Sequence, residues 1–222
     1  MATINWMNTS RADVTASLRF SDPKTTSKGM KILDLASNGQ WVVLQTPKLV
    51  APFGASDKYE PGKYKLLLSL APTKPGEHEQ AVIDQFIRML KAVDEKVIDH
   101  VFKNQEAVLG VSGKSKELIA DRFYPLVKVK EGCEPALDLK FDKKYEVYGA
   151  GREAKAIEDI TPGSLNVALV RLSGIWVNSK GFGVTAKAMQ VMTTPGVPEN
   201  KIEGCAIVDM KEWRLNTILF YC

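Results

Sequence analysis

Short runs of apolar and β-branched residues, separated by turn-forming residues, predict that this chain is built mainly from β-strands. The clearest pair covers residues 167–177 and 182–192, which flank the polar segment 178–181. Gly181 can take the positive φ that a tight turn needs, so the two runs are expected to form a β-hairpin. Both faces of the first run are largely apolar, which is typical of a strand in the middle of a sheet.

Two aromatic residues, Trp176 and Phe182, flank the predicted turn. Strict alternation along the first strand places Arg171 on one face and Trp176 on the other. Trp176 can be either a core residue or a platform on which a base stacks. Phe182 stands between two glycines that leave its ring room, so we expect Phe182 to act mainly in binding and Trp176 mainly in folding.

Further strands and one long helix follow from the same patterns. Strands are predicted at residues 40–46, 63–70, 125–130, 136–141 and 145–149. A helix is predicted over residues 77–103, because Phe86, Leu90 and Val97 belong to an apolar stripe with three- and four-residue spacing. A single stripe indicates that the helix packs on the sheet.

Sequential strands around one inserted helix favour an antiparallel or mixed sheet over a doubly wound parallel one. The predicted fold class is mainly β (α+β), either an OB-like Greek-key barrel or a mixed antiparallel sheet with one long packed helix. Residues 1–38 are polar and turn-rich and are expected to form a loosely ordered arm, with one short strand near residues 15–20. Residues 39–200 would form the OB-like nucleic-acid-binding domain, and residues 201–222 a C-terminal strand or interaction tail.

Composition and charge exclude several classes of protein. The 222 residues are 45% hydrophobic and 25% charged, as in globular proteins. The net charge is +4, but residues 77–106 carry seven acids and four bases, or −3, which leaves +7 on the rest. Three scattered cysteines favour a reducing compartment, and two histidines without a nearby cysteine cluster speak against structural zinc. The N-terminus has no apolar signal core, so neither secretion nor membrane insertion is predicted.

The hairpin region carries cations and rings but no Asp or Glu between residues 160 and 198. This combination suits single-stranded nucleic acid, because cations meet phosphates and rings stack on bases. The predicted phosphate contacts are Lys128, Lys130, Lys140, Lys143, Lys144, Arg152, Arg171, Lys180 and Lys187. The predicted stacking rings are Tyr145, Tyr148, Trp176 and Phe182. No catalytic residue, metal ligand or cofactor is predicted.

Two partial motifs do not predict an enzyme. The segment VSGKS, residues 111–115, matches the end of a phosphate-binding P-loop, but Val108 stands where the loop needs its first glycine. The segment GAGREA, residues 149–154, lacks the long helix and the later acid of a dinucleotide site. We expect both segments to be loops and the protein to be non-enzymatic.

The segment with Gly174, Ile175 and Trp176, then a short polar turn, then Phe182 and Gly183, resembles OB-fold single-stranded DNA-binding proteins of nucleocytoplasmic large DNA viruses. Segments 123–128 and 137–141 are similar to that family as well, and the resemblance covers roughly residues 115–195. It implies an intracellular protein, in the host cytoplasm, the nucleus or the virion. It also implies that the protein coats DNA without sequence preference during replication, recombination or repair.

Three functions are therefore considered. The first is a non-sequence-specific binder of single-stranded DNA. Binding to RNA, formation of a homo-oligomer and binding to replication proteins are left open, and no membrane partner is predicted. The alternative is a viral structural or scaffold protein that assembles through a sheet edge and the apolar C-terminus. A nucleotide enzyme, resting on Gly113, Lys114 and Ser115, has the least support.

Overall fold

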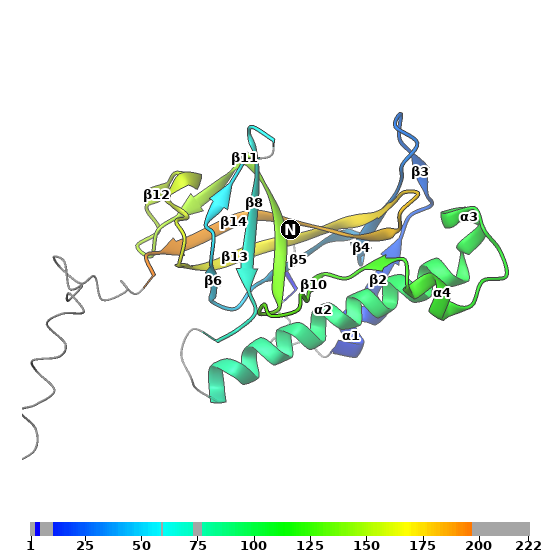
Figure 1. Cartoon of the computed structure of the whole chain (residues 1–222), viewed down its shortest axis with the longest axis horizontal. Helices are drawn as coiled ribbons and strands as arrows, with labels where there is room; N and C mark the ends of the chain where they lie inside the picture. The colour runs from blue at the N-terminus through cyan, green and yellow to red at the C-terminus, as the bar shows by residue number, and fades with distance from the viewer. Residues whose placement is uncertain (1–2, 5–10, 59, 73–76, 197–222) are drawn as a thin grey trace, which may run out of the picture.

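The computed structural model describes residues 3–4, 11–58, 60–72 and 77–196. Their main element is a mixed β-sheet of 14 strands that is not closed, accompanied by one long helix (Figure 1). The predicted fold class is confirmed, and of its two forms the mixed sheet is the one observed.

The sheet follows the order β1-β5-β4-β13-β14-β11-β8-β7, and the other short strands pair along its margins. The strands are β1 (Thr3–Ile4), β2 (Leu18–Phe20), β3 (Lys24–Thr25), β4 (Lys31–Ser37), β5 (Gln40–Gln45), β6 (Leu49–Ala51), β7 (Ala55–Ser56), β8 (Lys63–Ser69), β9 (Phe123–Tyr124), β10 (Val127–Lys128), β11 (Ala136–Tyr148), β12 (Ala154–Lys155), β13 (Ser164–Val177) and β14 (Phe182–Thr194). The helices are α1 (Arg11–Ser17), α2 (Glu77–Lys103), α3 (Gln105–Leu109), α4 (Lys116–Ala120) and the 3-10 helix η1 (Ile157–Asp159).

The predicted hairpin is present as β13 and β14 and lies in the middle of the sheet. A bulge between Leu172 and Ile175 shifts its register. Gly174 has a φ of 148°, and a Cβ there would lie 2.2 Å from the carbonyl oxygen of Leu33, so the position requires glycine. The bulge reverses the alternation of side chains along β13. Trp176 therefore lines the same groove as Arg171, and the prediction that places them on opposite faces is wrong.

One long strand, β11, replaces the two strands predicted at residues 136–141 and 145–149. It pairs antiparallel with β8 and parallel with β14, and its register against β14 shifts between Phe141 and Glu146. The shift lets β11 change direction without leaving the sheet. Both halves of β11 consequently remain neighbours of the central hairpin.

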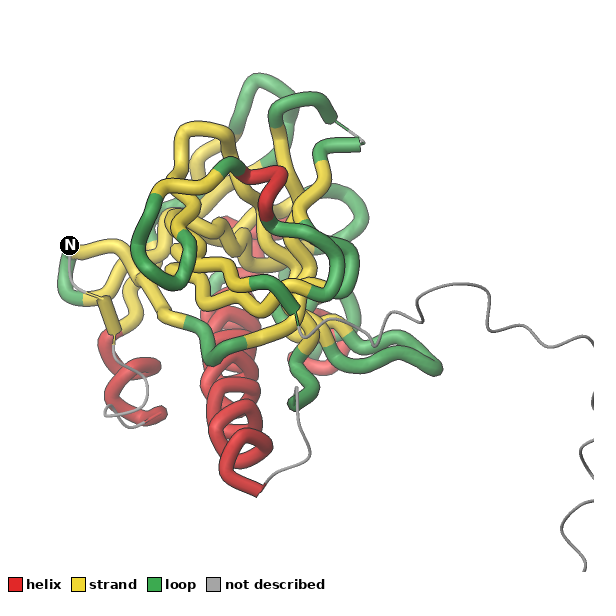
Figure 2. The backbone as a smooth tube through the Cα atoms, turned by 90° about the vertical axis from the view of Figure 1, so that its left-hand side faces the viewer, coloured by secondary structure: helices red, strands yellow, loops and turns green. Residues whose placement is uncertain are grey.

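Helix α2 has the bounds predicted for it and lies along one side of the strands (Figures 1 and 2). Three residues of its apolar stripe, Phe86, Leu90 and Val97, are fully buried. These side chains share one core with Leu66 of β8 and Phe141 of β11. None of the helices in the described part of the chain combines the length and the apolar character that a membrane span needs.

Residues 18–37 differ from the loosely ordered arm that their polar composition predicts. The short strand expected near residues 15–20 is limited to β2, directly after α1. Strand β4 pairs with both β13 and β5, and its Leu33 and Leu35 are buried. Phe20 stacks on His100 of α2 with ring centroids 4.2 Å apart, and burial lowers the pKa of His100. Contacts with residues far away in the sequence therefore hold this segment in place. The strand or tail predicted at residues 201–222 lies outside the described residues.

Asp94 joins α2 to the segment before β10. Its Oδ2 accepts a hydrogen bond from the backbone N–H of Leu126 at 3.0 Å, and the residue is 6% exposed. Its buried Oδ1 has no hydrogen-bond partner among the described residues. Burial raises the pKa of Asp94 to about 7, although the bond from Leu126 and the charge of Lys128 act in the opposite direction.

Asp94→Asn is expected to stabilise the protein more at pH 8 than at pH 5. The folded-state pKa lies above the ordinary value of 3.8, so the stability contributed by the neutral carboxyl is full below that value and is lost as the pH rises through 7. Asparagine still accepts the bond from Leu126 and does not ionise. Relative to wild type, its free energy of unfolding should increase by about 3 kcal/mol between the two pH values. Urea unfolding measures this, with exposed Asp121→Asn as control; a difference independent of pH would contradict it.

Candidate nucleic-acid interface

Four cationic side chains lie next to one another across the sheet. The strand register pairs Lys65 of β8 with Lys140 of β11, Lys140 with Lys187 of β14, and Lys187 with Arg171 of β13. Neighbouring strands are about 4.8 Å apart, so these four residues, the cationic row, span roughly 14 Å. Like charges directly opposite each other repel. A bound anion above the cationic row would remove that repulsion.

Arg171 is held by an aromatic ring and has an unused donor. Its guanidinium carbon lies 3.6 Å from the centre of the Trp41 ring, at cation–π distance. Arg171 Nε and the neighbouring Ser173 Oγ are buried, and neither finds a hydrogen-bond partner among the described residues. A buried donor without an acceptor is costly, and a phosphate oxygen is an acceptor that both atoms can use.

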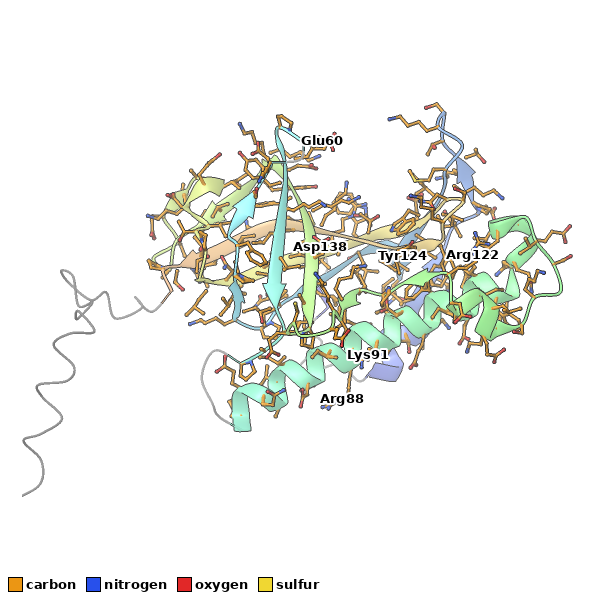
Figure 3. The ribbon with its side chains drawn as sticks, in the orientation of Figure 1. Glu60, Arg88, Lys91, Arg122, Tyr124 and Asp138 are labelled. Carbon is orange, nitrogen blue, oxygen red and sulfur yellow. The ribbon has the colours of Figure 1, made fainter. Side chains whose placement is uncertain are left out.

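The cationic row belongs to an open groove of about 940 Å³. Ile32 and Asp34 of β4 line one side of it, and Glu60 and Lys63, at the start of β8, line the other. In Figure 1 these sides are two raised arms, with the β13–β14 hairpin passing between them. Figure 3 shows Glu60 at the top of one arm and Arg88 on α2 at the opposite side of the sheet. No residue of α2 lines the groove.

The acids of the groove face cations of their own. Asp34 Oδ2 lies 2.9 Å from Lys24 Nζ. Glu60 forms an ion pair with Lys63, and the hydrogen bond from Lys63 lowers the pKa of Glu60. Asp142 stands opposite Lys63 in the register of β8 and β11. These contacts neutralise the two sides, so the cationic row determines the positive charge of the groove.

A pair of aromatic rings marks the hairpin end of the groove. Trp176 is partly exposed and packs on Tyr124 of β9 with ring centroids 5.3 Å apart. Tyr124 is 43% exposed, and Lys128 Nζ lies 5.8 Å from the centre of its ring. A Cβ on Gly183 would approach the Trp176 ring to 3.0 Å, which explains the glycine beside this ring. Trp176 and Tyr124 are therefore the stacking candidates at this end.

Phe182 is fully buried, and its predicted role as a stacking ring is wrong. Its ring packs on Phe123 with centroids 5.3 Å apart, and its backbone N–H donates to the carbonyl of Arg122. The glycines on either side leave room for the α4–β9 segment rather than for a ligand: a Cβ on Gly181 would meet the carbonyl oxygen of Arg122 at 2.2 Å. The expected role of Phe182 is thus wrong, whereas a role of the partly exposed Trp176 in binding stays a prediction.

Similar chains occur among solved structures. The single-stranded DNA-binding protein from bacteriophage Enc34 is 15% identical over 88% of this chain and 99% of its own, with a TM-score of 0.39. For gp2.5, a single-stranded DNA-binding protein encoded by bacteriophage T7, the identity is 14% over 74% of this chain and 98% of its own, with a TM-score of 0.48. No protein-family model and no curated protein matches the sequence.

Of the predicted site residues, Lys140, Arg171, Trp176 and Lys187 line the groove. Tyr148 and Arg152 line a second hollow of about 530 Å³, and Lys143 and Tyr145 line a third of about 290 Å³. Lys144 Nζ lies 5.2 Å from the centre of the Tyr145 ring. The predicted set is therefore brought together only in part.

Three other predicted cations are exposed at the margins of the sheet. Lys128 belongs to β10, and Lys130 follows it in a loop. Lys180 is in the hairpin turn, where its backbone N–H donates to Asn178 Oδ1 at 2.8 Å. Their contacts with nucleic acid remain predictions.

Three residues of the interface were not among the predicted site residues. Lys65 could have been found, because residues 63–65 alternate Lys-Tyr-Lys in a predicted strand. Trp41 also lies in a predicted strand, but only the register places that strand, β5, beside Arg171. Tyr124 joins Trp176 because β9 runs parallel to β14, a pairing of segments about 60 residues apart.

The partial P-loop forms a turn, as predicted. Gly113 has a φ of 67°, and the backbone N–H of Lys114 donates to Gln105 Oε1 at 2.9 Å. Ser115 Oγ accepts from the N–H of Leu118 and caps the five-residue helix α4. Within the described ranges, no three His, Cys, Asp or Glu side chains gather into a group that could hold a metal ion.

Proposed function

We propose that this protein binds single-stranded nucleic acid without sequence preference and acts in DNA replication, recombination or repair as a non-enzymatic accessory protein. The observation that carries the proposal is the cationic row, which lies in an open groove with two buried donors that have no partner among the described residues. Phosphates supply both the negative charge that complements the cationic row and the acceptors for the two buried donors.

The partly exposed rings favour an unpaired strand. Trp176 lines one end of the groove and Tyr124 packs on its ring, while Trp41, 49% exposed, stacks on Arg171. Rings stack on bases that are not already stacked in a duplex, and stacking depends little on base identity. Single-stranded DNA is the proposed ligand, with RNA as the matched comparison.

The finer assignment to single-stranded DNA-binding proteins of nucleocytoplasmic large DNA viruses stays a prediction. The same holds for a location in the host cytoplasm, the nucleus or the virion. The scaffold alternative depends on residues 201–222, which lie outside the described residues, and no specific contact favours it.

The proposal predicts tight binding to an unpaired oligonucleotide that weakens steeply with salt. If each of the four cations contacts one phosphate, log Kobs should fall with log salt with a slope of about −3, since each contact on a single strand contributes about 0.7. Fluorescence anisotropy measures the slope, with labelled oligo-dT at salt concentrations from roughly 50 mM to about 300 mM.

A duplex and an RNA oligonucleotide of equal length are the controls in this titration. The rings predict weaker binding to the duplex, because its bases cannot reach Trp176 and Tyr124. Absence of binding at low salt, or equal affinity for the duplex, would refute the proposed function.

A further inference from the structure

A second hollow continues the open face of the sheet beyond the cationic row. It is lined by Leu169 and Val167 of β13 and by Gln190 and Met192 of β14. In the register Leu169 pairs with Gln190, and Val167 with Met192. Leu169 is two residues from Arg171 along β13, so the hollow begins about 7 Å from the cationic row. A strand bound over the row in this direction reaches it within about one nucleotide.

The floor of the second hollow is apolar and accessible. Met192 is 38% exposed, and Val167 and Leu169 are partly exposed. The hollow measures about 530 Å³, within the range of small-ligand sites, roughly 300–1,000 Å³. An apolar surface beside a charged row suits the flat face of a nucleobase, because the base loses water there while its phosphate stays over the cations.

A carboxylate lies next to the hollow and repels phosphate on that side. Glu146 of β11 pairs with Gln190 in the register, and its Oε2 accepts from Tyr148 Oη at 2.8 Å and from Gln190 Nε2 at 3.2 Å. The bond to Glu146 raises the pKa of Tyr148, so the phenol remains a donor and its ring is fixed beside the hollow. One amide hydrogen and Oε1 of Gln190 remain for the edge of a base.

We infer that this second hollow is a nucleobase subsite, with Val167, Leu169 and Met192 under the base and Gln190 at its edge. The inference rests on the proposed function and divides the open face into two parts. The cationic row binds the phosphate backbone of the nucleic acid. The carboxylate of Glu146 repels that backbone, so the base occupies the hollow. Arg152, which lines the same hollow, provides a cation for the adjoining phosphate.

The test compares wild type with the double variant Leu169→Ala/Met192→Ala on two labelled probes. One probe is oligo-dT, and the other is an oligonucleotide of equal length made only of abasic sites, which keeps the phosphates and lacks the bases. Wild type should bind the abasic probe at least tenfold more weakly than oligo-dT. The double variant should lose about tenfold on oligo-dT and less than twofold on the abasic probe.

Gln190→Ala, a smaller change, should show the same selectivity with a loss of a few-fold, and Leu118→Ala on α4, an exposed position outside the hollow, should change neither affinity. Circular dichroism melts of all variants verify that they are folded. Equal losses on both probes would overturn the subsite, as would equal wild-type affinity for the two probes, although salt-dependent binding would then still support the proposed function. No salt-dependent binding to either probe would overturn both.

Discussion

Phe182→Ala should lower the free energy of unfolding by about 3–5 kcal/mol, the usual range for removal of a buried large aromatic side chain. Phe182 is fully buried, packs on Phe123, and starts β14 at the point where β9 joins the sheet. Its loss leaves a cavity between the hairpin and the α4–β9 segment. Thermal melting followed by circular dichroism should show a midpoint about 10 °C below that of wild type.

Trp176→Ala is the matched control, because it removes the other ring beside the same turn. Trp176 is partly exposed and lines the groove, so its variant should melt closer to wild type and lose about 1–3 kcal/mol of binding to oligo-dT. A Phe182→Ala protein that melts like wild type would contradict the structural role of Phe182, and a Trp176→Ala protein with unchanged affinity would contradict the binding role of Trp176.

The triple variant Lys140→Ala/Arg171→Ala/Lys187→Ala should weaken binding to oligo-dT on the order of 100-fold at low salt. These three side chains are adjacent in the register and line one groove, so they act on the same stretch of backbone. Removing three phosphate contacts should also reduce the slope of log Kobs against log salt by about two. Anisotropy titrations at several salt concentrations give both numbers.

The control for this variant is Arg88→Ala/Lys91→Ala/Lys103→Ala on α2, which changes the net charge by the same amount. These cations are exposed, and α2 contributes no residue to the groove (Figure 3). The α2 variant should keep the wild-type slope. If both variants lost affinity equally, total charge rather than the groove would determine binding.

Periodicity predicted the parts of the fold that depend on neighbours in the sequence. The bounds of α2 follow from its single apolar stripe, and the β13–β14 hairpin follows from two apolar runs around a polar turn. Lys140, Arg171 and Lys187 were also found from charge alone, because the acid-poor hairpin and the alternating strand before it display their cations. The sequence did not show that the three are adjacent, because adjacency depends on register between strands.

The predicted side of Trp176 is wrong for a reason that lies within β13. The alternation of side chains holds along β13 as far as Ser173 and is reversed at Gly174, where the backbone takes a φ of 148° against β4. A glycine inside an apolar strand is a known sign of a bulge. The direction in which the bulge turns Trp176 depends on Leu33, whose segment was expected to be a loose arm. The ordered N-terminal segment therefore bears on the side of Trp176, whereas the burial of Phe182 depends on its packing against the α4–β9 segment.

The groove has two raised sides and no cover: the arms of β3–β4 and β8–β11 stand apart, and the sheet does not close around the space between them (Figure 1). A ligand can thus be laid in laterally at any point of its length, whereas a closed ring must be threaded from an end or opened. For the proposed ligand this means that chain ends are not needed. Gaps between paired regions and covalently closed circles become as accessible as free tails, and a bound protein can leave without sliding off a terminus.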